Sequence, residues 1–142
     1  MAKNQDILEG KIGQKILDEL EEFPSKVKEG REGATFLTIS NKKDKKGLTV
    51  QVTLGEEKDT TYQDGELVQS LFTVNIASIE YSRKDEVYAI LEDYGLDKND
   101  VFQESPNYVT LEYETDLEGI ATLSTHIMEE FHDDLEVSFD TN

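Results

Sequence analysis

Apolar residues near the start of the chain recur at the spacing of one face of a helix. Intervals of three or four residues, which line up side chains on an α-helix, separate Ile12, Ile16, Leu20, Phe23 and Val27. Pro24 falls inside this stripe and predicts a kink or an end of the helix near Phe23. Gly30 and Gly33 then break the chain.

The next segments follow the alternating pattern of β-strands. Residues 34–40 form a short run rich in β-forming residues, and residues 48–54 alternate apolar with polar side chains. That alternation is the period of a half-buried strand. The polar stretch 41–47 ends in glycine and predicts a hairpin connection. An acidic loop over residues 56–65 precedes a long third strand over residues 67–79.

Two further helices are predicted from their start signals. Residues 82–85 have the form of a capping box, and Gly95 is suited to the end of the helix that follows. Residues 115–118 repeat the capping-box pattern. The helix that they open carries an apolar stripe made of Ile120, Leu123, Ile127, Phe131 and Leu135.

The remaining segments complete the predicted fold. Residues 101–104 and 108–114 are expected to form a hairpin, and residues 135–139 alternate like a final strand that docks on the sheet edge or on a partner. The predicted order is α-β-β-β-α-β-β-α. Because the strand connections are short, we expect an α+β fold with an antiparallel sheet and helices on one side. No linker or repeat interrupts the pattern, so residues 1–142 are expected to form a single domain.

This order of elements, with the small size and the acidity, resembles the type III secretion chaperones and related chaperone-like domains of bacteria. The resemblance is one of topology over nearly the whole chain and includes no sequence motif. It implies a homodimer that binds an extended segment of another protein and has no catalytic activity. The segments that carry it are helix 12–23, the strands around Leu37, Val50 and Val74, helix 84–94, the hairpin around Pro106 and helix 120–135.

The composition narrows the class of protein. The chain has no cysteine, which excludes disulfides, thiolate nucleophiles and cysteine-ligated metal sites. The first ten residues have no apolar run behind a basic cluster, and no stretch approaches the roughly 20 apolar residues that a membrane-spanning helix needs. We therefore expect a cytoplasmic protein with no membrane partner.

Negative charge is concentrated in one part of the chain. The net charge is −18; residues 1–46 hold ten basic and nine acidic side chains, whereas residues 47–142 hold four basic and 23 acidic ones. No Lys or Arg follows Lys98. Self-repulsion of this size costs stability and is not required for folding. The acidity therefore serves either solubility, including in a salty cytoplasm, or binding.

No arrangement typical of an active site is present in the sequence. His126 and His132 are six residues apart on a predicted helix, about 240° around its axis, so the two cannot share a metal. Each has neighbouring carboxylates that would form part of a carboxylate–imidazole site, but surface histidines on an acidic helix are the simpler interpretation. Phosphate-binding glycine loops and the Gly-x-Ser-x-Gly motif do not occur. We predict no enzyme, no metal and no cofactor, with a small metal-dependent enzyme as an alternative.

The acidic C-terminal region is the best candidate for a binding surface. Carboxylates two residues apart on a strand lie about 7 Å from each other, a spacing comparable to that of successive phosphates on one nucleic-acid strand. An ordinary solvated surface is the alternative interpretation. The candidate partner-binding residues are Glu112, Glu114, Glu129, Glu130, Asp133, Asp134, Glu136, Val137 and Phe139.

Two versions of a protein-binding function remain open. In a chaperone- or adaptor-like version, an apolar groove near Leu135, Val137 and Phe139 holds an extended peptide by strand addition. In an antagonist version, the carboxylates imitate the phosphates of DNA and block a basic nucleic-acid-binding protein, as phage-type inhibitors and toxin-neutralising proteins do. Direct nucleic-acid binding is disfavoured by the net charge, and the lysines of residues 42–46 are expected at a solvated hairpin tip. The expected partner is a basic protein, and a homodimer is possible.

Overall fold

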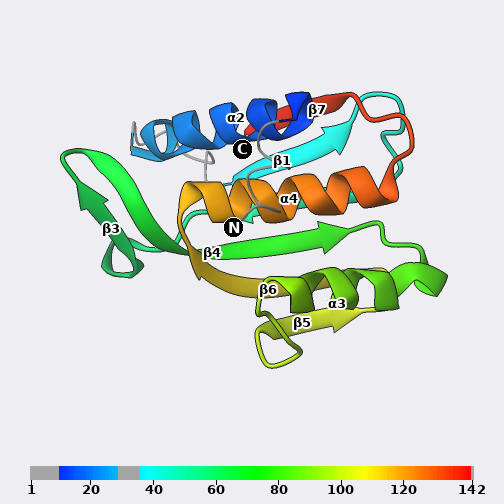
Figure 1. Ribbon diagram of the computed structural model, residues 1–142. Helices are drawn as coiled ribbons and strands as arrows, with labels where there is room; N and C mark the ends of the chain where they lie inside the picture. The colour runs from blue at the N-terminus through cyan, green and yellow to red at the C-terminus, as the bar shows by residue number, and fades with distance from the viewer. Residues whose placement is uncertain (1–9, 29–35, 142) are drawn as a thin grey trace.

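The computed structural model describes residues 10–28 and 36–141, without the side chains of residues 25–28 and 57. This part of the chain forms a seven-stranded antiparallel sheet with three α-helices (Figure 1). The strands are β1 (Phe36–Asn41), β2 (Thr49–Thr53), β3 (Thr60–Gln63), β4 (Glu66–Ala77), β5 (Val101–Ser105), β6 (Tyr108–Thr115) and β7 (Val137–Thr141). Their order in the sheet is β5-β6-β4-β2-β1-β7, and β3 pairs with β4 outside this path. The predicted α+β class with an antiparallel sheet is confirmed.

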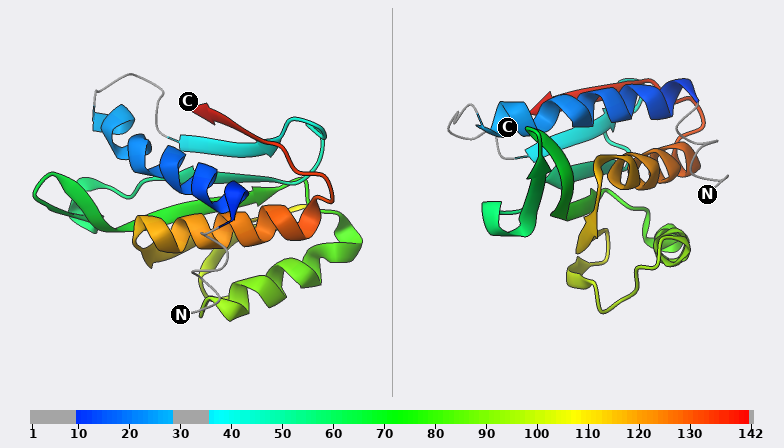
Figure 2. Two further views of the ribbon diagram at one scale, coloured as in Figure 1. Left: turned by 45° about the horizontal axis from the view of Figure 1, so that its top comes forward. Right: turned by 60° about the vertical axis from the view of Figure 1, so that its left-hand side comes forward.

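The helices are α2 (Lys11–Lys28), α3 (Lys84–Asp93) and α4 (Leu117–Phe131), with short 3-10 turns at Glu57–Asp59 and Tyr81–Arg83. Helix α4 contacts β2, β4 and β6 across the middle of the sheet, and α2 lies beside it (Figure 2). The fold is therefore built of two layers, with the helices on one face of the sheet.

The hydrophobic core lies between these layers. In β1, β2 and most of β4 every second side chain is buried, as the alternating sequence pattern requires. Phe72, Val74 and Ile76 of β4 have no exposed surface, and the register places them opposite alternate residues of β6. The helices close the core with the buried faces of their apolar stripes.

The opposite face of the sheet carries no helix of the described chain and is largely polar. Thr38, Gln51, Thr73 and Asn75 are half-buried there, on successive strands. Asn75 Nδ2 donates a 2.6 Å hydrogen bond to Thr110 Oγ1 on the neighbouring strand β6. We call this surface the open face.

A hairpin of β3 and β4 occupies part of the predicted acidic loop, so the expectation of a loop over residues 56–65 is wrong for residues 60–63. Its turn has Asp64 at φ 54° and Gly65 at φ 84°, and two positive φ values are the signature of a type I′ hairpin turn, for which Asp-Gly is a preferred sequence. The hairpin projects from one end of the sheet (Figures 1 and 2).

The sequence predicts a kink or an end of the helix at Pro24, and the end is wrong, because α2 continues through Pro24 to Lys28. Proline removes one backbone hydrogen bond from the helix, and the buried face that includes Leu20 and Phe23 outweighs this loss. The predicted break at Gly30 and Gly33 lies outside the described residues.

The start of α3 differs from the predicted capping box. Ser82 lies in the preceding 3-10 turn, and Arg83 is the N-cap residue, without a side-chain cap hydrogen bond. Arg83 instead donates two hydrogen bonds to the Glu86 carboxylate, at 2.7 and 3.1 Å. The bonded guanidinium lowers the pKa of Glu86.

Candidate partner-binding surfaces

Three exposed carboxylates gather where α4 ends. Glu129 and Glu130 lie in its last turn and Asp133 follows directly. Within the described part of the chain none of the three forms an ion pair, and the last turn of α4 has no basic residue. Carboxylates at this end of a helix face the partial negative charge of the unpaired carbonyls. We call Glu129, Glu130 and Asp133 the helix-end group.

One cation, Arg83, approaches the end of α4 from the start of α3. Its guanidinium carbon lies 4.2 Å from the centre of the Phe131 ring, and Nη2 donates to the Glu130 carbonyl at 3.3 Å. The charge of Arg83 is shared with Glu86, so it caps the helix without neutralising the helix-end group.

The N-terminus of α4 is fixed by Asp116, whose Oδ1 accepts the Gly119 backbone N–H at 2.7 Å. The predicted capping box placed the cap one residue earlier, at Thr115. The helix also ends earlier than its apolar stripe predicts, because His132 has extended backbone angles and Leu135 lies in the loop to β7.

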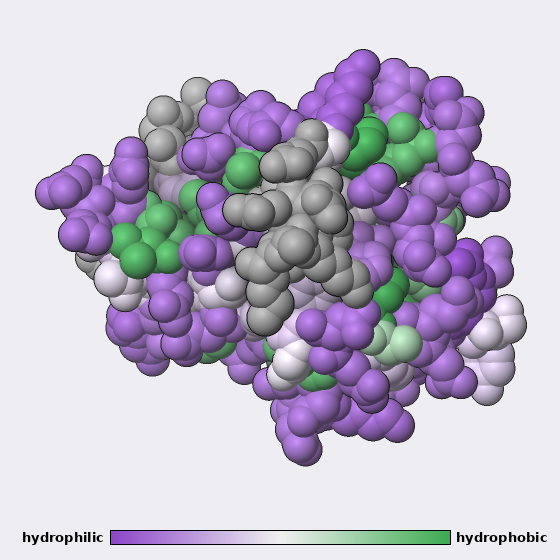
Figure 3. All heavy atoms as spheres, in the orientation of Figure 1, coloured by the Kyte–Doolittle hydropathy of each residue, from purple (hydrophilic) through white to green (hydrophobic). Residues whose placement is uncertain are grey.

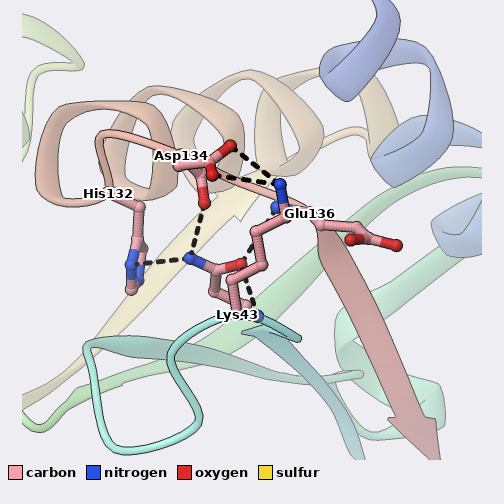
Figure 4. A network of polar contacts seen from close by, with 5 residues as sticks. Lys43, His132, Asp134 and Glu136 are labelled. Carbon is pink, nitrogen blue, oxygen red and sulfur yellow. Dashed lines mark hydrogen bonds and ion pairs between the residues drawn. The ribbon is translucent and has the colours of Figure 1, made fainter.

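Asp134 and Glu136 belong to a polar network that joins this loop to the end of β1 (Figure 4). Its centre is the buried amide of Asn41, whose Oδ1 accepts the backbone N–H groups of Lys43 at 3.1 Å and Glu136 at 2.9 Å. Its Nδ2 donates to the Asp134 carbonyl at 3.1 Å and lies 3.2 Å from His132 Nδ1. The Asp134 carboxylate pairs with Lys43 Nζ at 3.0 Å.

This network also defines the state of His132. Because Asn41 Oδ1 must face two N–H donors, its Nδ2 must donate to His132 Nδ1. His132 Nε2 then carries the proton and donates to the Leu48 carbonyl at 2.9 Å. A Cβ at Gly47 would lie 2.6 Å from His132 Cε1, so the turn needs glycine there. His132 is buried, and the expectation of a surface histidine is wrong for this residue.

His126 is half-buried and lies 3.0 Å from the Tyr94 hydroxyl through Nδ1. Across the described chain, no three side chains of histidine, aspartate or glutamate come together in a way that could hold a metal ion.

Glu112 and Glu114 lie on the open face, exposed on β6. They stand opposite Thr73 and Leu71 of β4, and Gln69 Nε2 donates to Glu114 Oε1 at 2.7 Å. Helix α4 starts just after β6 and its 15 residues span about 22 Å. The helix-end group therefore lies near the opposite end of the molecule, and the predicted acidic residues form two separate surfaces.

Val137 and Phe139 of β7 lie beside β1, whose register pairs Asn41 with Val137 and Ile39 with Phe139. Val137 is buried in the core, and Leu135 and Phe139 are partly buried against it. These apolar side chains are largely used in the packing of the protein itself.

A cleft of about 440 Å³, not anticipated from the sequence, opens between β6 and the loop from α3 to β5. Glu112 and Glu114 lie on its rim, and its apolar wall includes Leu71, Tyr94 and Phe102. Phe102 is one of three large hydrophobic residues of the described chain that are exposed, with 59% of its surface accessible. The only sequence signal of this site is the aromatic residue Phe102, which stands next to polar residues at the start of the short strand β5.

A second hollow of about 300 Å³ lies where the β3–β4 hairpin meets α2 and α4. Its apolar side chains include Leu17, Leu67 and Val68. Figure 3 shows the helix-bearing face as mainly hydrophilic, with a hydrophobic patch over this hairpin.

Comparison with protein-family models, with curated proteins and with solved structures found no match. None of the helices within residues 10–28 and 36–141 combines the length and apolar character needed to cross a membrane.

Proposed function

We propose that the protein is a non-catalytic binding module that holds a basic protein partner through its acidic surfaces. The observation that carries the proposal is a set of exposed carboxylates on β6, on α4 and just after the end of α4. None of them is in an ion pair within the described residues: Glu112, Glu114, Glu129, Glu130 and Asp133.

The energetics of these carboxylates support a binding role. A carboxylate at the C-terminal end of a helix costs about 0.3–1 kcal/mol, and Glu129 and Glu130 both occupy such a position. A net charge of −18 adds repulsion throughout the molecule. A basic partner turns both unfavourable contributions into attraction, because its cations approach carboxylates that form no ion pair within residues 10–28 and 36–141.

The resemblance to type III secretion chaperones adds a homodimer to this proposal. The open face supports that addition, since no helix of the described chain covers its half-buried side chains, such as Gln51 and Thr73. In this version two copies meet through the sheet and leave the helix-end group of each copy accessible to a partner.

A second candidate function is that of an antagonist that imitates phosphates. Glu112 and Glu114 favour it, because alternate residues of one strand hold their carboxylates about 7 Å apart on a rigid support. The target in this version is a protein whose basic groove binds nucleic acid.

The test is affinity capture from a nuclease-treated lysate of the source cells, eluted in salt steps, with wild-type protein and charge-neutral variants. Glu129→Gln/Glu130→Gln/Asp133→Asn removes the helix-end group, and Glu112→Gln/Glu114→Gln removes the pair on β6. A control variant removes three exposed carboxylates elsewhere, at Asp64, Glu66 and Glu92.

We expect a basic protein that wild type and the control variant capture and that one of the two test variants loses. The helix-end variant should at the same time melt at a higher temperature than wild type, which separates lost binding from lost folding. A nucleic-acid-binding partner released at moderate salt favours the antagonist. Identical captured proteins from wild type and both test variants would contradict the proposed function.

A further inference from the structure

The cleft beside β6 exists because two neighbouring strands are offset. Strand β5 begins at Val101, which pairs with Leu111 of β6. The last backbone hydrogen bond along this edge of β6 is the one that the Glu112 N–H donates to the Asp100 carbonyl, at 3.1 Å. Strand β6 continues to Thr115. Beyond Glu112, therefore, the outer edge of β6 borders the loop from α3 instead of another strand. The gap left beside β6 is a notch, and this notch forms the cleft.

Phe102 stands at the mouth of the notch because the strand pairing is irregular there. The register shifts between Val101 and Gln103, and a bulged residue of this kind is turned away from the regular alternation of the strand. Its exposed ring is therefore part of the lining of the cleft, as Glu112 also is. An aromatic face that lines a cleft together with carboxylates can contact the flat side of a cation.

The walls of the cleft are held in place. Tyr94 contacts His126 through its hydroxyl at 3.0 Å and through an edge-on ring contact of 5.8 Å between centroids. Burial, with Tyr113 nearby, raises the pKa of Tyr94 to about 12, so the hydroxyl stays neutral. Strand β5 is tied to α3, since Lys84 Nζ donates to the Ser105 carbonyl at 2.6 Å.

The charge of the lining is of one sign. No basic residue lines the cleft, and Glu112 has no polar side-chain partner in the described chain. The third carboxylate of the lining, that of Asp100, already accepts the Asp97 backbone N–H at 2.9 Å. Glu112 is therefore free to meet a cation beside an aromatic face, and Glu114, which accepts a neutral hydrogen bond from Gln69 at 2.7 Å, is in no ion pair within the described residues.

We infer that this cleft binds an arginine side chain on an exposed segment of a partner protein. The planar guanidinium stacks on the Phe102 ring while its N–H groups donate to Glu112 and Glu114, a combination that the compact ammonium of lysine does not reproduce. The inference rests on the proposed function, because it assigns one part of the basic partner to one site.

The test is an NMR titration of the full-length, 15N-labelled protein with three short peptides. The probes are acetyl-Gly-Arg-Gly-amide, its lysine analogue and its citrulline analogue, which keeps the shape of arginine without the charge. We expect the arginine peptide to shift amide signals of Phe102, Glu112 and Glu114 in a saturable way. The lysine peptide should bind about two- to fivefold more weakly, because its ammonium neither stacks as a plane nor forks its hydrogen bonds between two carboxylates, and citrulline should leave these signals in place.

Two variants test the assigned contacts. Phe102→Ala should weaken arginine binding about two- to fivefold by loss of the stacked ring, and Glu112→Gln/Glu114→Gln should weaken it by up to about tenfold. Val68→Ala is the matched control, because Val68 is also an exposed apolar residue, 42% exposed, but lies outside this cleft.

Several outcomes would overturn the inference. They are shifts spread over all acidic surfaces, no saturable shift at the cleft, equal affinity for the lysine peptide, or an unchanged affinity in Phe102→Ala. None of these contradicts the proposed function, because its capture test also includes the helix-end group and fails only when neither test variant loses the captured protein.

Discussion

Replacement of Asn41 by alanine should be among the most destabilising single changes to a polar residue of this protein. The side chain is 2% exposed and connects the end of β1 to the loop between α4 and β7. Alanine removes two hydrogen bonds to backbone N–H groups, one to a carbonyl and one to the His132 ring.

The size of the effect follows from these four contacts. A hydrogen bond contributes a net of about 1 kcal/mol, and a buried group left without a partner costs more. Because Lys43 and Glu136 lie at the surface, water can reach part of the network after the substitution. We therefore expect a loss of about 3 kcal/mol, a large share of the roughly 5–15 kcal/mol typical of a whole domain.

The assay is urea unfolding followed by circular dichroism, with Asn75→Ala as the matched control. Asn75 is half-buried on β4 and its side chain makes one hydrogen bond, at 2.6 Å to Thr110, so its loss should cost about 1 kcal/mol. A double-mutant cycle with His132→Ala should show that the two losses are not additive. Equal effects of Asn41→Ala and Asn75→Ala, or full additivity with His132→Ala, would refute the reasoning.

Three further predictions concern packing and alkaline stability. Gly119→Ala should destabilise the protein by about 1–2 kcal/mol despite the better helix propensity of alanine, because the added Cβ would clash with the Thr115 hydroxyl oxygen. Urea unfolding should show recovery in Gly119→Ala/Thr115→Ala, which removes that oxygen. Val137→Ala should cost about 2 kcal/mol in the same assay, since this side chain is part of the core; an unchanged midpoint would mean that Val137 does not pack as described. Tyr94→Phe should reduce the loss of stability above pH 10. Between pH 10 and about 12 the unfolded chain loses the Tyr94 proton while the folded protein keeps it, because the pKa is raised in the folded state, and this difference favours unfolding. Urea midpoints from pH 8 to 11.5 check this, and identical pH profiles for wild type and variant would contradict it.

Much of the fold could be predicted because several segments have a single strong periodicity. Residues 48–54 alternate cleanly and contain β2, and the stripe from Ile120 to Phe131 lies within α4. The hairpin strand β3 was missed because residues 60–63 are mostly polar, although the Asp64–Gly65 pair is a recognised hairpin turn. Local signals failed where packing decided the outcome, as at Pro24 inside α2.

The candidate site was predictable only as a set of residue types. The sequence identifies the exposed acids, but the separation of Glu112 from Glu129 depends on the direction of α4 across the sheet. The role of His132 depends on Asn41, which is 91 residues away in the chain. The cleft at Phe102 arises from the offset between β5 and β6, which no local pattern records.

The pairing of β7 with β1 has a consequence for how the chain is made. Residues 137–141 close the edge of a strand that begins at Phe36, so translation must pass about one hundred codons before that partner is available. Until then, the nascent chain carries an uncovered strand edge, and such edges recruit other chains. A ribosome-bound chain that stops short of residue 137 should therefore depend on a holding chaperone, whereas release of the β7 segment completes the sheet and ends that dependence.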